Sequence, residues 1–136
     1  MARQGQQLLK EETRGYLEYA EKRLSAEAVE AARAECEDLA ARPLGALDDA
    51  DVLVTPTVPC VAPTHEEAAA RQEGRPRRPV VSKLTRIPGP VNVAGLAALS
   101  VPCDVGAGLP VGLQLIGRDE ETVLRLGAAF ESAGRV

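Results

Sequence analysis

Residues Gly89–Gly117, GPVNVAGLAALSVPCDVGAGLPVGLQLIG, decide the fold of this chain. The stretch holds a Pro/Gly-rich turn, two apolar runs and a Gly-rich connection, and Asp104 is its only carboxylate. The runs Ala98–Val101 and Val111–Ile116 are short and bounded by Gly and Pro, which predicts buried strands rather than helices. The connection over residues 104–110 is short enough for a hairpin, so we expect the two strands to pair antiparallel.

Two helices are predicted before this stretch. Residues 5–23 place apolar side chains on one face of a helix. Ser25 is a good N-cap for a second helix, and Glu27 lies in its first turn, where the helix dipole favours a carboxylate. Pro43 is expected to end or kink this helix, because it lacks an N–H and disfavours helical geometry at the preceding residue. A short turn of helix is expected to resume through Leu44–Leu47. The predicted apolar face of the second helix consists of Val29, Ala32, Cys36, Leu39 and Ala40.

A third strand and a long loop are predicted between the helices and the central stretch. Asp51–Thr55 is a short apolar strand candidate, and Pro56 ends it because proline cannot donate to a central ladder. Residues 56–83 are rich in proline and arginine, which predicts a surface loop with one helical turn at Thr64–Arg71. After the next Pro/Gly turn, Val91–Leu96 predicts a short helix that leads into the first core strand.

The last helix is predicted to begin at Asp119, with two glutamates in its first turn. The element order predicts an α/β fold, with a small mixed sheet flanked by helices in one unit over residues 1–136. We divide this unit into a helix pair (5–48), a strand (51–55), a surface loop (56–83), and core strands with the last helix (84–133). The inner face of the last helix is expected to consist of Val123, Leu126, Gly127 and Phe130.

A sheet of three apolar strands needs cover on both faces, and at least one of its edges stays open. The open edge predicts a partner chain or self-association. The net charge of −4 gives no indication of a nucleic-acid or membrane partner. No apolar run approaches the ~18 residues of a transmembrane helix, and the N-terminal residues lack the apolar region of a signal peptide. Three widely spaced cysteines favour reduced thiols in the cytoplasm over disulfides or a zinc site, and we expect no cofactor.

Three motifs give the chain a family resemblance. They are DVLVTPTVP at Asp51–Pro59, LTRIPGPVNVAGLAALSVPC at Leu84–Cys103 and GLPVGLQLIGR at Gly108–Arg118. In this order and spacing they resemble the C-terminal region of the amidase-signature hydrolases. That family includes bacterial amidases, fatty-acid amide hydrolase and the A subunit of glutamyl-tRNA amidotransferase. The resemblance extends over nearly the whole chain from about Glu12.

The resemblance implies acyl transfer from an amide by a Ser–cis-Ser–Lys triad. In such a triad the hydroxyl needs a base, and the developing oxyanion needs preorganised donors. The family places this triad in a Gly/Ser-rich signature that precedes the C-terminal region. This chain has four serines, three lysines and no Gly-Gly-Ser-Ser run, so no catalytic position is carried over. The resemblance therefore implies an amidase fold that is inactive alone and that meets a small amide substrate only in the complete enzyme.

The same resemblance gives three substrate-binding candidates. Asn92 matches an asparagine of the family's motif, and it either fixes the local turn through backbone bonds or helps to wall the substrate pocket. Thr85 and Arg86 are looser candidates for the pocket wall.

Three functions follow from these observations. The first is the C-terminal portion of an amidase, and the second is a non-catalytic interaction subunit that pairs with an N-terminal amidase chain. The third is an independent enzyme that uses Cys60, near His65, or Ser82, beside Lys83. A Cys–His pair needs a stabilised thiolate and an oriented imidazole, and adjacent side chains on an extended segment point to opposite faces. The residues therefore favour incidental placement for both pairs.

Overall fold

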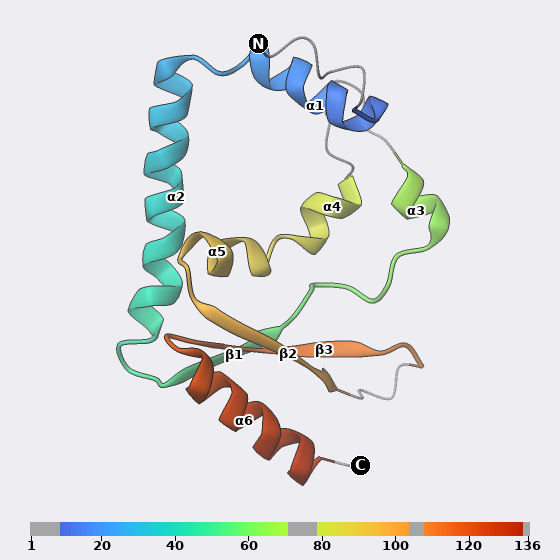
Figure 1. Ribbon diagram of the computed structural model, residues 1–136. Helices are drawn as coiled ribbons and strands as arrows, with labels where there is room; N and C mark the ends of the chain where they lie inside the picture. The colour runs from blue at the N-terminus through green and yellow to red at the C-terminus, as the bar shows by residue number, and fades with distance from the viewer. Residues whose placement is uncertain (1–8, 71–78, 104–107, 135–136) are drawn as a thin grey trace.

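A computed structural model describes residues 9–70, 79–103 and 108–134 (Figure 1). Its centre is a three-stranded sheet in which β3 (Val111–Gly117) lies between β1 (Val52–Pro56) and β2 (Ala97–Cys103). Both ladders are antiparallel, which confirms the predicted pairing of the two core strands. The α/β class and the small sheet are confirmed, but the described sheet is wholly antiparallel rather than mixed. The reason is that β1 and β2 each pair with β3 and not with each other.

The last helix, α6 (Glu120–Ala133), covers one face of the sheet (Figure 1). Its N-cap is Asp119 as predicted, and the Asp119 carboxylate accepts a 2.8 Å hydrogen bond from the backbone N–H of Thr122. The close approach depends on Gly127, where an added Cβ would overlap Leu99 of β2. Gly127 is buried and Phe130 is half-buried.

Leu126 corrects the predicted inner face of α6. It is 39% exposed, whereas Val123 is 2% exposed. Val123 and Gly127 are one turn apart and both point at the sheet, so the intervening positions turn to the flank of the helix. Gly127, and not Leu126, is the residue at which α6 packs closely on the strands.

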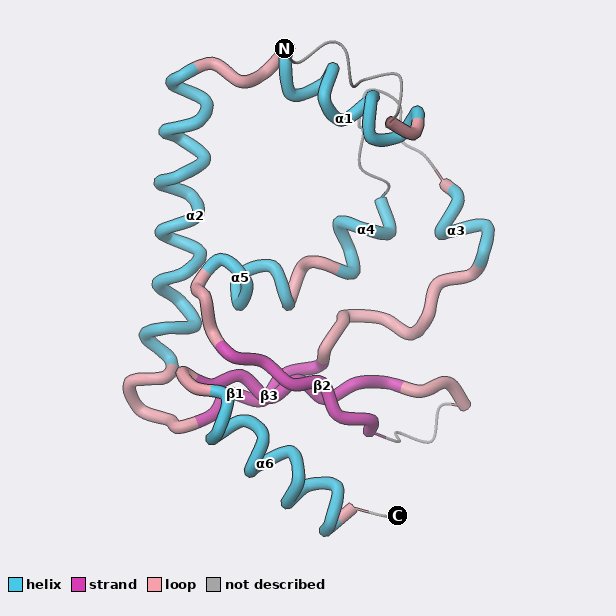
Figure 2. The backbone as a smooth tube through the Cα atoms, in the orientation of Figure 1, coloured by secondary structure: helices cyan, strands magenta, loops and turns pink. Residues whose placement is uncertain are grey.

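In the described part of the chain, five further helices lie on the other side of the sheet or beyond it (Figure 2). They are α1 (Glu11–Glu21), α2 (Ala26–Ala46), α3 (His65–Ala69), α4 (Pro79–Leu84) and α5 (Pro88–Val93). The predicted first helix begins at Glu11, and residues 5–8 of that prediction lie outside the described residues. The short helix predicted over Val91–Leu96 is present as α5, which begins three residues earlier because Pro88 suits the first helical turn.

Pro43 lies inside α2, which runs on to Ala46, so the prediction that the helix ends at Pro43 is wrong. The end of α2 is also held by contacts distant in sequence. Arg118, which follows β3, donates a 3.1 Å hydrogen bond to the carbonyl of Leu44 and forms a 2.6 Å ion pair with Asp48. The carbonyl of Leu44 thus accepts from Arg118 in addition to the backbone N–H of Leu47.

The described residues of the predicted surface loop over 56–83 contain two helices, of which the second runs on to Leu84. One is α3, which begins at the N-cap Thr64 as predicted, although Arg71 of the predicted turn lies outside the described residues. The other is α4, which falls in the stretch predicted to be loop. Pro79 opens α4, where its fixed backbone angle favours the helix, and the backbone N–H of Thr85 bonds to the carbonyl of Val81 at its end.

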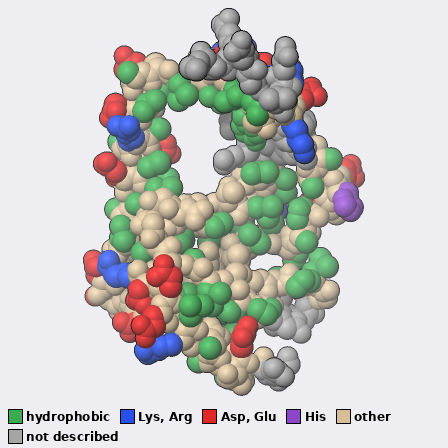
Figure 3. Space-filling view, viewed as in Figure 1, with side chains coloured by type: hydrophobic (Ala, Val, Ile, Leu, Met, Phe, Trp, Pro, Cys, Tyr) green, Lys and Arg blue, Asp and Glu red, His purple; other side chains and the backbone are tan. Residues whose placement is uncertain are grey.

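The hydrophobic core is small. Buried hydrophobic residues in the described part of the chain are Leu47, Val91, Val101, Leu115, Ile116 and Val123. The accessible surface is 10523 Å², whereas a compact monomer of this mass exposes about 6,800 Å². Figure 3 shows an opening through the molecule between α1, α2 and α5, with hydrophobic side chains around it. No helix among the described residues is both long enough and apolar enough to span a membrane.

Candidate functional site

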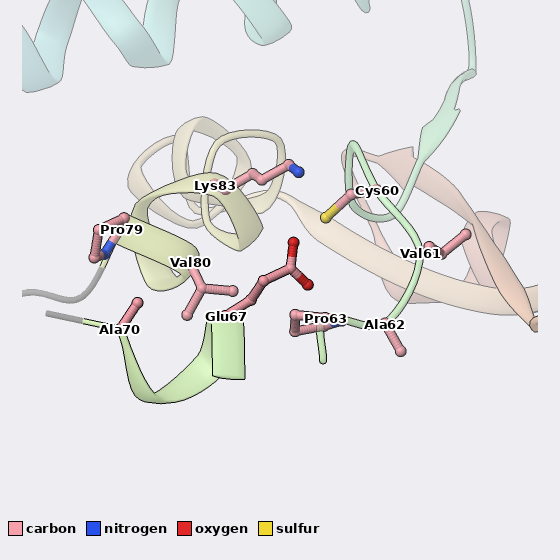
Figure 4. A pocket seen from close by; sticks show the side chains of 9 residues that line it. All are labelled: Cys60, Val61, Ala62, Pro63, Glu67, Ala70, Pro79, Val80 and Lys83. Atoms are coloured by element: carbon pink, nitrogen blue, oxygen red, sulfur yellow. The ribbon is translucent and has the colours of Figure 1, made fainter. Parts of the chain in front are cut away.

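A pocket of about 310 Å³ lies between α3, α4 and the segment that leaves β1 (Figure 4). A capping box builds one wall of it. The side chain of Thr64 accepts from the backbone N–H of Glu67 at 3.2 Å, and Glu67 Oε2 accepts from the backbone N–H of Thr64 at 2.8 Å. The pocket is lined by Cys60, Val61, Ala62, Pro63, Glu67, Ala70, Pro79, Val80 and Lys83.

Three polar side chains point into this pocket, and Figure 4 shows them converging from three segments. They are the thiol of Cys60, the carboxylate of Glu67 and the ammonium of Lys83. The backbone N–H of Thr64 lowers the pKa of the Glu67 carboxyl most, followed by the Thr64 hydroxyl and then the Lys83 charge. The pocket thus combines an apolar wall with one anionic, one cationic and one thiol group.

The described geometry supports neither of the two nucleophile–base pairs considered from the sequence, Cys60 with His65 and Ser82 with Lys83. His65 is exposed on α3 and does not line the pocket that holds Cys60. Ser82 and Lys83 are consecutive in α4, and consecutive positions on a helix do not face each other. Ser82 also does not line the pocket.

The substrate-binding candidates lie on the segment that runs from the end of α4 into α5, outside the pocket of Figure 4. Thr85, Arg86 and Asn92 are all exposed. The Thr85 hydroxyl donates a 2.8 Å hydrogen bond to the carbonyl of Val81, which ties it to α4. The side chains of Arg86 and Asn92 make no hydrogen bond within the described residues.

The turn after α5 is fixed by the backbone and not by the Asn92 side chain. The Asn92 carbonyl accepts from the N–H of Gly95 at 3.2 Å, and Gly95 adopts a φ of +65° that glycine allows. Of the two roles considered for Asn92, the described contacts thus give no support to a side-chain bond within the turn.

A row of polar side chains on the sheet face that points away from α6 was not predicted from the sequence. Thr55 donates a 3.3 Å hydrogen bond to the Gln114 Oε1, and the hydroxyls of Thr57 and Ser100 lie 2.5 Å apart. Gly112 leaves room for this second pair, because a Cβ there would overlap both hydroxyls. Gln114 is only 6% exposed. The signal in the sequence is the alternation of polar and apolar residues in Leu99–Val101 and Leu113–Leu115.

Sequence relatives place this geometry in a family. The sequence profile of the amidase family matches residues 1–124. The A subunit of glutamyl-tRNA(Gln) amidotransferase from Moorella thermoacetica is 48% identical over 90 residues, which cover 65% of this chain and 17% of the relative. Its counterpart in Geobacter metallireducens is 46% identical over 93 residues, which cover 66% of this chain and 18% of the relative. The chain thus spans less than a fifth of these relatives.

Solved structures give the same result. The crystal structure of the A subunit of glutamyl-tRNA(Gln) amidotransferase from Thermotoga maritima superposes with a TM-score of 0.57 and 31% identity. The match covers 80% of this chain and 22% of that one. A crystal structure described as an amidase superposes with a TM-score of 0.71 and 28% identity, over 92% of this chain and 29% of the other. The chain belongs to the amidase-signature family and corresponds to the C-terminal portion of its relatives.

Proposed function

We propose that residues 1–136 form the C-terminal portion of an amidase-signature hydrolase and are inactive alone. The complete enzyme would convert a carboxamide to a carboxylate plus ammonia or an amine. A serine of the N-terminal portion would attack the amide carbonyl, the amine would leave with a proton, and water would release the acyl group. This chain would contribute core strands, helices and part of the substrate wall.

The observation that carries the proposal is the surface that this chain leaves uncovered. It exposes 10523 Å², which is about one and a half times the area of a compact monomer of its mass. Such an excess of exposed surface supports the presence of a further body that packs against this chain. The relatives, of which the chain spans 17% and 18%, offer that body in their remaining length.

The substrate-wall role rests on three exposed side chains of one short segment. Thr85, Arg86 and Asn92 supply a hydroxyl, a guanidinium and a carboxamide, which together recognise the polar end of an amide. The described residues support neither a Cys60–His65 nor a Ser82–Lys83 pair. This favours a role in the substrate wall over a role as catalytic centre. The three free thiols support the predicted cytoplasmic location.

The second candidate function is that of a non-catalytic interaction subunit. The exposed helices α1 and α2 favour this function too, because they leave surface for a partner chain. In this case the chain would pair with an N-terminal amidase chain and stabilise it without completing a substrate site. The two functions differ in whether pairing produces turnover.

One experiment tests both functions. The chain is treated with a serine-reactive fluorophosphonate, alone and after mixing with the unmatched N-terminal remainder of the Moorella thermoacetica relative, and intact masses are measured. Ammonia release from glutamine and from benzamide is measured in parallel. We expect no adduct on this chain, and an adduct on the remainder with ammonia release in the mixture.

The other outcomes are also informative. Co-elution of the two chains without adduct or turnover would favour the non-catalytic interaction partner. If a serine of this chain forms a stoichiometric adduct that is lost when Ser82 is changed to Ala, both functions are overturned and the chain is an independent enzyme.

A further inference from the structure

The pocket between α3, α4 and the segment that leaves β1 is not used by the proposed function. We propose that this pocket is a thiol-modification site, at which Cys60 forms a mixed disulfide with a small thiol that carries both a carboxylate and an ammonium group. The pocket has a volume of about 310 Å³, which is at the lower end of the ~300–1,000 Å³ of small-ligand sites. A ligand of this size is a single amino acid or a short peptide rather than a macromolecule.

The two charged groups of the pocket are available to a ligand. Glu67 Oε2 accepts from the backbone N–H of Thr64 at 2.8 Å and from the Thr64 hydroxyl at 3.2 Å, whereas Oε1 accepts no hydrogen bond from the described residues. Within that part of the chain, the Lys83 ammonium forms no hydrogen bond and no ion pair with Glu67. The Lys83 charge lowers the pKa of the Glu67 carboxyl less than either Thr64 bond does, as expected for a charge that is nearby but not in contact.

Unpaired charges of opposite sign favour a ligand that carries the complementary pair. The Lys83 ammonium binds a carboxylate, and the Glu67 carboxylate accepts hydrogen bonds from an ammonium group. Val61, Pro63 and Val80 make the rest of the wall apolar, which suits a short carbon chain. An amino-acid thiol combines these three parts with a sulfur atom, so its chemistry matches that of the pocket.

Cys60 supplies the reacting group. Figure 4 shows its sulfur directed into the space toward which Glu67 and Lys83 also point. The co-reactant is the disulfide of the small thiol. The Cys60 thiolate attacks one sulfur of that disulfide, the old S–S bond breaks, and a new S–S bond forms to Cys60. The other half leaves as a thiolate and takes up the proton that Cys60 released, so the exchange consumes one disulfide, forms one and needs no further oxidant.

The other two cysteines provide a comparison within the same chain. Neither Cys36 nor Cys103 lines this pocket. Cys36 is exposed on α2, whereas Cys60 and Cys103 are half-buried. If exposure alone decided reactivity, Cys36 would react fastest with every disulfide. Recognition by the pocket predicts instead that Cys60 gains over Cys36 when the disulfide carries charges.

The test follows the reaction of the full reduced chain with small disulfides by peptide mass spectrometry. Cystine carries both charges, dithiodiglycolate only carboxylates, cystamine only ammonium groups, and hydroxyethyl disulfide neither. The rate at Cys60 is divided by the rate at Cys36 in the same sample. We expect this ratio to be about tenfold higher for cystine than for hydroxyethyl disulfide. A ratio that is the same for all four reagents would overturn the site.

Variants of Lys83 test the carboxylate contact. Lys83→Met removes the positive charge and keeps a long side chain, so we expect the Cys60 rate with dithiodiglycolate to fall by about fivefold and the rate with cystamine not to fall. Lys83→Arg keeps the charge and is expected to restore the rate with dithiodiglycolate. If the rate with cystamine falls as far as the rate with dithiodiglycolate in Lys83→Met, the effect is not recognition of a carboxylate and the proposal is wrong.

Glu67→Gln tests the ammonium contact. It removes the negative charge, while glutamine at this position still supports a capping box, so α3 is retained. We expect the Cys60 rate with cystamine to fall by about fivefold and the rate with hydroxyethyl disulfide to stay unchanged.

Lys22→Met is the control for net charge. Lys22 lies at the end of α1 and does not line the pocket, so all rates at Cys60 are expected to stay unchanged. If Lys22→Met slows the reaction with dithiodiglycolate as much as Lys83→Met does, only the charge of the whole chain matters and the site is overturned. None of these measurements depends on amide hydrolysis, so their outcome is independent of the proposed function.

Discussion

The body of the molecule and its helical arm, which consists of α1 and α2 (Glu11–Ala46), differ in how much of their apolar surface they bury. The body consists of the sheet and α6, and Leu115 in its central strand is 2% exposed. Leu24, between the two helices of the arm, is 65% exposed. Two leucines of one chain thus have opposite environments, which shows that one part of the fold buries its apolar side chains by itself while the other leaves them to solvent.

The difference is already present in the composition of the two regions. The strand β3 (Val111–Gly117) has no charged residue, whereas charged residues recur throughout α2. The arm is stabilised mainly by local terms, such as the Ser25 hydroxyl that accepts from the backbone N–H of Ala28 at 3.2 Å. Local terms of this kind are small beside the burial of a core strand.

The largest expected effect compares these two leucines directly. Leu115→Ala leaves a cavity between β3 and α6, and is expected to lower the free energy of unfolding by about 2–5 kcal/mol. Leu24→Ala removes a side chain that is mostly in water, and is expected to change the free energy of unfolding by less than about 0.5 kcal/mol. Urea unfolding followed by far-UV circular dichroism measures both. Similar losses would show that the arm is packed as tightly as the body in the isolated chain.

Much of the body could be predicted from the sequence, because its signals are local. The apolar runs flanked by Gly and Pro predicted both core strands and their pairing. Asp119 marked the start of α6, since a side-chain oxygen before a helix satisfies free N–H groups. The helical turn predicted over Thr64–Arg71 starts where α3 has its N-cap. The three motifs led to the amidase family without any structural information.

The features that escaped prediction depend on contacts between distant residues. Pro43 normally ends a helix, but Arg118 binds the last turn of α2 from 74 residues away. The helix α4 has six residues, too few for a periodic pattern, and lies in a stretch whose composition favours a loop. The pocket brings Cys60, after β1, together with Lys83 of α4. These residues are far apart in the sequence, so no motif spacing predicts the pocket.

A second prediction compares glycines in the helices of the two regions. Gly127→Ala on α6 places a Cβ against Leu99, so we expect a loss of about 1–3 kcal/mol despite the better helix propensity of alanine. Gly15→Ala on α1 meets no atom within 4 Å, and is expected to stabilise that helix by about 1 kcal/mol. Thermal unfolding measures the first change, and helical circular dichroism measures the second. A gain from both substitutions would show that α6 does not depend on close contact with β2.

The smallest expected effect concerns the pH dependence of the two helix starts. The backbone N–H of Thr122 lowers the pKa of the Asp119 carboxyl most, and the Thr122 hydroxyl adds to this. The folded pKa is thus below the unfolded value, so the stabilisation is present above the ordinary aspartate pKa of about 3.9 and is lost as the pH falls through the folded pKa. Asp119→Asn keeps an equally good cap without the charge, so its melting temperature should fall less on acidification.

The matching change in the arm is Glu27→Gln. The pKa of the Glu27 carboxyl is lowered by its own backbone N–H first and by the Ser25 hydroxyl second. This carboxylate stabilises α2, which adds little to the cooperative unfolding of the body. We therefore expect Glu27→Gln to lower helical circular dichroism near neutral pH and to leave the melting temperature and its pH dependence unchanged. If Glu27→Gln alters the acid dependence as much as Asp119→Asn does, the arm and the body unfold as one unit, and the contrast between them is wrong.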